Sequence, residues 1–200
     1  GSHGTIGNTD GTGTAALFKN PGGIVLQGAY LYVADSGNFT IRRINISTRA
    51  VTTFAGTGVS VSVDGTGILA GFSSAYGIDT DGANLYVTDE NCIRKITIAG
   101  AVVTTLAGQA AAWGTADGTG TAASFQGPMG LTPYGGFLYV SDTDNYTIRK
   151  VDIATAAVTT IAGEAGTDGS ADSIPPRFNY PFDVASDGEN LYVCDTHNHT

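Results

Sequence analysis

The chain has 200 residues, of which 29 are glycine and only 14% are charged, and its 9 basic and 18 acidic residues give a net charge of −9. Abundant apolar and β-branched residues exclude a disordered chain. Scarce Leu, Glu, Lys and Arg disfavour a helical bundle, and no stretch reaches the roughly 18 apolar residues of a membrane span. We therefore expect an acidic all-β protein rich in glycine turns. Residues 1–3 are typical of a tag remnant and are left out of the fold prediction.

One phrase, Leu-Tyr-Val-x-Asp, recurs four times along the chain. Its last residue is Asp35, Asp89, Asp142 and Asp195. The spacing is nearly constant, and a fixed period of this kind is the signature of a solenoid, a propeller or an array. The sequence therefore consists of one structural unit repeated, and residues 4–200 are predicted to form a single repeat domain.

Each repeat is predicted to form four short strands, which in the first copy span residues 23–26, 31–35, 41–46 and 51–55. The second strand is apolar on both faces, as in sheets that are covered on both sides. Four-stranded antiparallel sheets that cover one another face to face are the blades of a β-propeller. The predicted blades span approximately residues 20–56, 74–108, 127–163 and, for a partial fourth blade, 180–200. We expect three full blades and half of a fourth, joined by long Gly-rich interblade loops.

The segments that follow two of the repeated Asp residues carry a recognisable motif. They read Asp35-Ser-Gly-Asn-Phe-Thr-Ile-Arg-Arg and Asp142-Thr-Asp-Asn-Tyr-Thr-Ile-Arg-Lys. Together with the Pro-x-Gly openings at Pro21 and Pro128, they resemble the NHL repeat. The resemblance implies a β-propeller used mostly as a binding platform for other molecules. The long interblade loops resemble those of bacterial surface or secreted NHL arrays, which implies an extracellular or periplasmic location.

The repeated Asp residues are predicted to have a structural role, because catalysis does not need one copy in every blade. A repeated arginine follows three of them, at Arg42, Arg94 and Arg149. It shares a strand face with apolar residues, and a buried guanidinium needs a carboxylate or carbonyl partner. Pairing the second strand with the third is expected to place residue 35 opposite residue 42, and residue 142 opposite residue 149. We therefore predict an Asp–Arg tie in each full blade.

The interblade loops and the first strands carry the candidate binding residues. Trp113 lies in the long interblade loop that includes residues 109–114, and the other repeats have no tryptophan there. It is interpreted either as an exposed binding anchor or as a side chain packed over a blade edge. Tyr76, Tyr134 and Tyr180 lie near the first strands, and together with Trp113 they predict a recognition surface on one rim of the propeller.

The sequence offers no credible catalytic constellation, since the histidines outside the tag remnant are His197 and His199, in one predicted turn. We expect no cofactor, with calcium at residues 79–84 as the alternative, although that segment lacks the downstream Glu of an EF-hand. A second functional hypothesis is a hydrolase or lyase whose metal is held by Asp79 and Asp183. Nucleic-acid binding is not expected, because the chain is acidic and lacks a basic stripe. A membrane partner is not expected either.

Cys92 and Cys194 occupy positions that are filled by small residues in the other repeats, so both are predicted to be free, buried thiols.

The sequence stops at Thr200, after the second strand of the fourth repeat. Half a blade leaves an open strand edge, and such edges pair with other chains. We expect either self-association of two copies, most simply as a dimer through the half-blade, or a fragment of a longer propeller. The ligand, a protein or a glycan, is not specified by the sequence.

Overall fold

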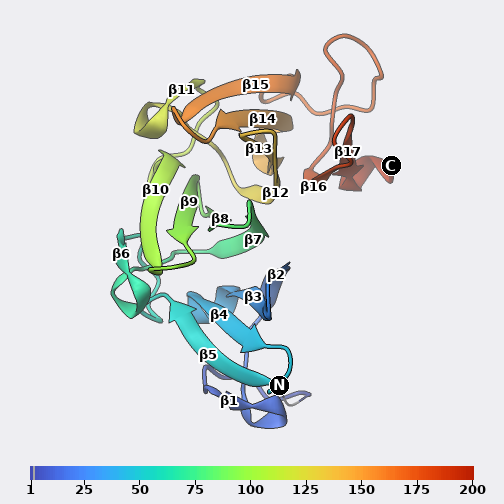
Figure 1. The fold of residues 1–200 in the computed structure, drawn as a ribbon. Helices are drawn as coiled ribbons and strands as arrows, with labels where there is room; N and C mark the ends of the chain where they lie inside the picture. Colours follow the sequence, from blue (N-terminus) through green and yellow to red (C-terminus); the bar gives the residue numbers. More distant parts are fainter. Residues whose placement is uncertain (2) are drawn as a thin grey trace. The chain divides into compact units, whose positions relative to one another are not determined.

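The computed structural model describes residue 1 and residues 3–200, and it is built of antiparallel strands joined by turns, loops and single-turn 3-10 segments (Figure 1). Three sheets have five strands and a fourth has two. The predicted all-β architecture of propeller blades is confirmed. Among the described residues, no helix is long and apolar enough to cross a membrane.

The first blade has the strand order β1-β5-β4-β3-β2. Its strands are β1 (Gly11–Thr12), β2 (Pro21–Gln27), β3 (Tyr30–Asp35), β4 (Thr40–Asn45) and β5 (Ala50–Ala55). The four longer strands are those expected from the repeat. The short strand β1 was not predicted. It forms because the Gly-Thr step of the preceding loop pairs with β5 at the outer edge of the sheet.

The second and third blades repeat this order, as β6-β10-β9-β8-β7 and β11-β15-β14-β13-β12. The strands of the second blade are β6 (Gly65–Thr66), β7 (Ala75–Thr80), β8 (Asn84–Asp89), β9 (Cys92–Thr97) and β10 (Val102–Gly108). Those of the third blade are β11 (Gly118–Thr119), β12 (Pro128–Tyr134), β13 (Phe137–Asp142), β14 (Thr147–Asp152) and β15 (Ala157–Gly163). The fourth sheet pairs β16 (Pro181–Ser186) with β17 (Leu191–Asp195).

The turn between the second and third strands corrects the predicted register. In the first blade, Asp35 lies opposite Thr40, and Arg42 lies opposite Val33. The expected alignment of residue 35 with residue 42 is therefore wrong, and so is that of residue 142 with residue 149, because Asp142 lies opposite Thr147. The 3-10 turn η2 (Ser36–Asn38) and a left-handed residue complete the reversal in four residues, fewer than the prediction assumed.

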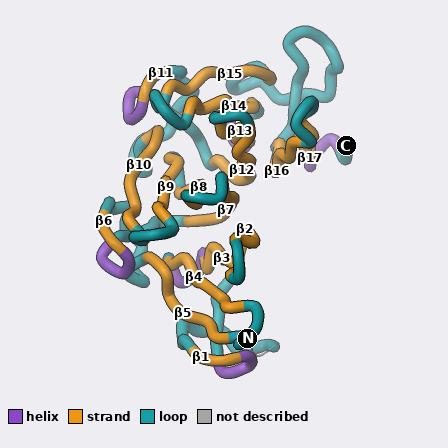
Figure 2. Tube along the Cα trace, in the orientation of Figure 1, coloured by secondary structure: helices purple, strands orange, loops and turns teal. Residues whose placement is uncertain are grey.

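The chain forms two compact units, and each is described by itself. The first comprises Gly1–Asp89 and Lys95–Thr104, and the second comprises Glu90–Arg94 and Thr105–Thr200. In the first unit, β7 packs against β2 and β3. The core between them includes Tyr32 and Phe54 from the first blade and Phe72, Ile78 and Leu85 from the second. In the second unit, β16 packs against β12 and β13. Figure 2 separates the strands from the loops that connect them.

Candidate functional site

An exposed tryptophan stands on a fixed loop in the second unit. The Trp113 side chain is 71% exposed, so the interpretation that packs it over a blade edge is not the arrangement observed. Its backbone forms a bridge with Phe125, and the next residue, Gly114, donates its N–H to the Phe125 carbonyl at 3.1 Å. The Gly114 carbonyl accepts a hydrogen bond from Asn145 Nδ2 at 2.7 Å. The indole is therefore presented to solvent by a backbone that is held on both sides.

Asn145 connects the Trp113 loop to a small aromatic cluster, consisting of Tyr146, Tyr180 and His197. The rings of Tyr146 and Tyr180 meet edge to face with centroids 5.4 Å apart, and His197 lies 4.4 Å from Tyr180. Tyr146 has a positive φ of 59° at the end of the 3-10 turn η5 (Thr143–Asn145). This conformation is unusual for a bulky residue, and here it turns the ring toward the start of β16. The cluster was not predicted, because His197 was assigned only to a turn.

The negative charges of Asp144 and Asp168 act on the Tyr146 hydroxyl of this cluster. The pKa of Tyr146 is raised by its hydrogen bond with Tyr180, by burial, and by the negative charges of Asp168 and Asp144. Burial also raises the pKa of Asp144. The rim of the second unit thus combines aromatic faces with acceptor oxygens. Such a surface suits a ligand with apolar faces and hydrogen-bond donors.

The structure does not gather all four predicted rim residues. Tyr180 directly precedes β16, as the segment that follows the Trp113 loop precedes β12. Both residues therefore lie before the first strand of a repeat. Tyr134 pairs with Phe137 across the hairpin at the opposite end of β12. Tyr76 lies in β7 of the first unit. The prediction of a single rim is therefore wrong for Tyr134, because a strand has two ends and proximity to a strand in sequence does not say which one.

The Asp–Arg contacts hold the loops onto the blades. Arg149 Nη1 donates to Asp142 at 2.7 Å, although the two residues lie diagonally across the strand pair, and its Nη2 donates to Asp117 at 2.9 Å. Further hydrogen bonds reach the carbonyls of Ser124 and Ala116. The guanidinium is almost fully buried. It therefore clamps the loop that follows Trp113 against the third blade.

The first blade repeats this clamp with the same geometry. Arg42 Nη1 donates to Asp35 at 2.8 Å, and Nη2 donates to Asp10 at 2.7 Å. The second carboxylates, Asp10 and Asp117, were not predicted as partners. A signal was present, since both belong to Asp-Gly pairs that recur with the period of the repeat.

The other repeated Asp residues also serve backbone groups. In the second blade, Asp89 accepts hydrogen bonds from the N–H groups of Ser73 and Ser74, both at 2.8 Å, and Arg94 is fully buried. In the fourth sheet, Asp195 accepts one from the Asn179 N–H at 2.7 Å. The same carboxylate position therefore holds the segment that precedes the first strand in every repeat.

Burial and hydrogen bonding shift the pKa values of the two carboxylates of the Arg149 clamp in opposite directions. Desolvation raises the pKa of Asp142 to about 6, in spite of hydrogen bonds from Asn145 and Gln126 and the charge of Arg149. The half-exposed Asp117 is also desolvated, but hydrogen bonds from Thr160 and Arg149 outweigh that cost and lower its pKa. Both carboxylates are engaged in holding structure together.

The predicted calcium segment is a hydrogen-bonded turn. The Asp81 carboxylate accepts the N–H groups of Ala83 and Asn84, at 2.8 and 2.7 Å, and the hydroxyl of Tyr86 at 2.7 Å. Desolvation raises the pKa of Asp81, yet these hydrogen bonds lower it on balance. Within the part of the chain that the structure describes, no three His, Cys, Asp or Glu side chains are grouped to hold a metal ion. Asp79 and Asp183 belong to different units.

The two cysteines differ in burial. Both are free thiols, and Cys92 is buried as expected, whereas Cys194 is exposed. The prediction of a buried Cys194 is therefore wrong. Its counterpart Ser141 is buried because the fourth sheet packs beside the third blade. No described element covers the face of β17 that carries Cys194.

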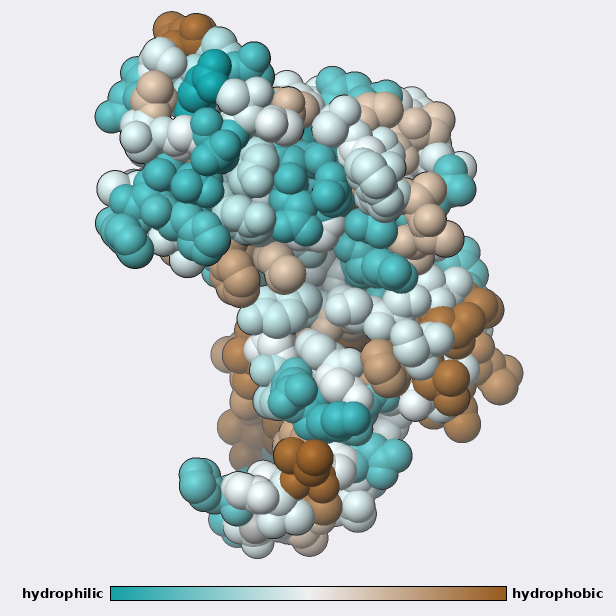
Figure 3. All heavy atoms as spheres, turned by 180° about the vertical axis from the view of Figure 1, so that it is seen from behind, coloured by the Kyte–Doolittle hydropathy of each residue, from teal (hydrophilic) through white to brown (hydrophobic). Residues whose placement is uncertain are grey.

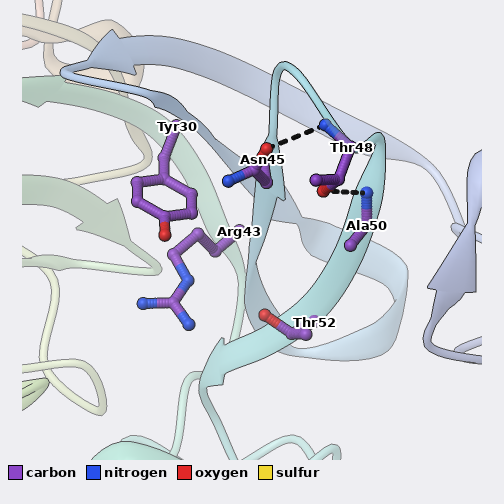
Figure 4. A pocket seen from close by; sticks show the side chains of 6 residues that line it. All are labelled: Tyr30, Arg43, Asn45, Thr48, Ala50 and Thr52. Carbon is purple, nitrogen blue, oxygen red and sulfur yellow. Dashed lines mark hydrogen bonds between the residues drawn. The ribbon is translucent and has the colours of Figure 1, made fainter.

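A hollow lies in the first blade (Figure 4). It has a volume of about 200 Å³ and is lined by Tyr30, Arg43, Asn45, Thr48, Ala50 and Thr52. That volume is below the roughly 300–1,000 Å³ of ordinary ligand pockets. Arg43 already lies over the Tyr30 ring at 4.9 Å, and the Asn45 side chain accepts the Thr48 N–H at 2.9 Å. The groups of this hollow therefore stabilise the hairpin.

Comparisons with known proteins agree with this architecture. The family model described as "LVIVD repeat" matches residues 21–57 and 129–155. "NHL repeat-containing protein 2" of Homo sapiens is 24% identical over 96% of this chain and 40% of its own length, and that of Gallus gallus is 26% identical over 96% and 32%. The chain carries NHL repeats. It spans less than half the length of these curated NHL relatives.

Solved structures share the fold of this NHL chain. A structural genomics protein of unknown function from Bacteroides thetaiotaomicron superposes with a TM-score of 0.71 and 28% identity, over 88% of this chain and 45% of that one. An auxiliary nutrient binding protein from Bacteroides ovatus gives 0.72 and 22%, over 92% and 47%. A streptogramin B lyase gives 0.58 and 14%, over 90% and 50%. The last two likenesses show the fold alone.

Proposed function

We propose that this NHL propeller is a non-enzymatic binding scaffold, and that a protein or glycan ligand docks on the rim of the second unit. The observation that carries the proposal is the exposed indole of Trp113 on a backbone fixed by Phe125 and Asn145. An aromatic side chain that is rigidly presented before binding contributes contact area at little cost in conformational entropy. Asn145, which bonds the Trp113 loop, directly precedes Tyr146, whose ring lies edge to face with that of Tyr180.

Two kinds of support favour binding over catalysis. The rim offers rings and carboxylates but no grouped metal ligands among the described residues. Two solved structures with this fold, from Bacteroides ovatus and Bacteroides thetaiotaomicron, are named auxiliary nutrient binding proteins. The proposed setting for such a scaffold is extracellular or periplasmic, which export of the full-length protein in its host would test.

The chain contains a single tryptophan, so intrinsic fluorescence reports on this site directly. Titration with an oligosaccharide panel and a peptide library should identify ligands that shift or quench the Trp113 emission. Trp113→Ala removes this fluorophore, so its Kd is measured by isothermal titration calorimetry; it should rise at least tenfold, because anchors of this type dominate binding. Tyr134→Ala, an exposed aromatic at the opposite end of a strand, is the control and should leave Kd unchanged. Ligands bound equally well by the Trp113→Ala protein would contradict the proposal.

We also propose that the chain self-associates as a dimer through the fourth sheet. This sheet contains only β16 and β17 among the described residues, whereas the other three contain five strands. Unpaired strand edges and uncovered sheet faces recruit further chains. Light scattering coupled to size exclusion should give a mass above the 20.3 kDa of one chain. A mass of one chain at all concentrations would exclude self-association.

A further inference from the structure

The first unit contains an internal example of how one blade covers the next. Tyr32 and Phe54 on one face of the first blade share a core with Ile78 and Leu85 on the facing side of the second. Tyr32 is 2% exposed and Ile78 is 7% exposed. The covering face thus presents aromatic rings, and the receiving face presents aliphatic side chains.

The first blade has a receiving face of the same kind, and its β2 residues are exposed. Ile24 pairs with Val33 in β2 and β3, as Ile78 pairs with Val87 in β7 and β8. Neighbouring residues in a strand point to opposite faces, so Ile24 and Leu26 point away from the core that includes Val25. Both are 57% exposed, and Ile46 on the adjoining turn is 49% exposed.

The fourth sheet has a covering face that covers nothing in the described chain. Val184 is buried on the side where β16 packs against β12. Ala185 and Tyr192 are paired across the strands and point to the opposite side. Tyr192 is 58% exposed, although its counterpart in the first blade is Tyr32. Its hydroxyl donates to Asp187 at 2.8 Å, as that of Tyr86 does to Asp81, so the ring is held in place before any contact forms.

We propose that the Tyr192 face of the fourth sheet docks on the Ile24 face of the first blade in a second copy of this chain. This inference rests on the self-association proposed above and names the two surfaces that meet. Each copy carries one covering face and one receiving face, so the contact is head-to-tail. It would remove from water the exposed apolar side chains on both sides, which is the ordinary driving force of association.

Each face can be tested by itself with charge substitutions at its exposed positions. The double variant Ile24→Asp/Leu26→Asp damages only the receiving face, and Tyr192→Asp damages only the covering face. The milder Ile24→Thr/Leu26→Thr pair keeps strand-forming residues, should the Asp pair disturb folding. Leu69→Asp is the matched control. Leu69 is 75% exposed in the 3-10 turn η3 (Gly67–Leu69), beside β6, where hydrophobic side chains gather on the surface shown in Figure 3.

Light scattering of each purified protein is the first measurement, with circular dichroism to check folding. We expect the wild type and Leu69→Asp to associate, and both face variants to be monomers with a Kd raised at least a hundredfold. An equimolar mixture of the two face variants should give a complex of two chains, because one intact face remains on each. The Ile24→Asp/Leu26→Asp variant keeps its covering face, which carries the exposed thiol of Cys194. That thiol should therefore react with maleimide more slowly in the mixture than when the variant is alone.

The possible failures are distinguishable. A monomeric wild type would overturn both the self-association and the assignment of its faces. A wild type that associates while the mixed face variants stay monomeric would overturn only the head-to-tail pairing. Dissociation by Leu69→Asp, with the face variants still associated, would place the interface on the β6 side instead.

Discussion

The third blade and the fourth sheet start from the same sequence phrase and reach different degrees of burial. Asn145 donates to Asp142 at 2.8 Å, and Asn198 donates to Asp195 at 2.6 Å, so the turn forms equally in both. Yet Asn145 is buried and Asn198 is half-buried. The turn is therefore a local product of its own residues, whereas burial depends on the strands and loops packed around it.

The largest expected effect comes from removing the arginine that only the complete blade possesses. Arg149→Leu leaves Asp142 buried without its cation, and breaking a buried pair in this way costs about 3–5 kcal/mol. Urea unfolding followed by circular dichroism measures the loss. Arg177→Leu is the control, because its ion pair with Glu164 is solvent-exposed and such pairs contribute about 0–1 kcal/mol. Equal losses in the two variants would show that burial does not decide the strength of the clamp.

A smaller effect is expected when the same asparagine is removed from each region. Asn145→Ala removes the donor of the partly buried Gly114 carbonyl and one of the donors to the buried Asp142, which costs about 1–3 kcal/mol. Asn198→Ala should cost less, because water reaches that turn and replaces the lost donor. Thermal unfolding of the two variants gives the comparison directly. A larger loss at Asn198 would contradict the role assigned to the surrounding strands.

The smallest effect concerns pH and the exposed carboxylate of the Arg149 clamp. Because the pKa of Asp117 is lowered in the folded state, its ionised form stabilises the fold above its unfolded pKa of about 4. That stabilisation is lost as the pH falls through the lower, folded pKa. The difference in Tm between the wild type and Asp117→Asn should therefore be constant from pH 5 to 7 and shrink below pH 4. A difference that grows on acidification would reverse the assigned sign.

Some of the site followed from the sequence and some did not. The Asp–Arg pairing was predicted because the repeat places a carboxylate and a guanidinium in every full blade, but its register was wrong because η2 is shorter than assumed. Asp10 and Asp117 were missed, since their contacts with Arg42 and Arg149 span more than 30 residues of chain. The aromatic cluster around Tyr180 needed the packing of two repeats, which no single repeat encodes.

The sequence by itself determined the repeat, the four main strands of each blade and the local turns, because these depend on residue types within a few positions of one another. Only the tertiary structure decided that the loop of Trp113 is fixed while its indole is exposed, and that Tyr134 lies at the wrong end of its strand for the same rim. It also decided that Ile24 and Tyr192 are exposed where their counterparts are buried. Burial is a property of neighbouring elements, and identical repeats acquire different neighbours.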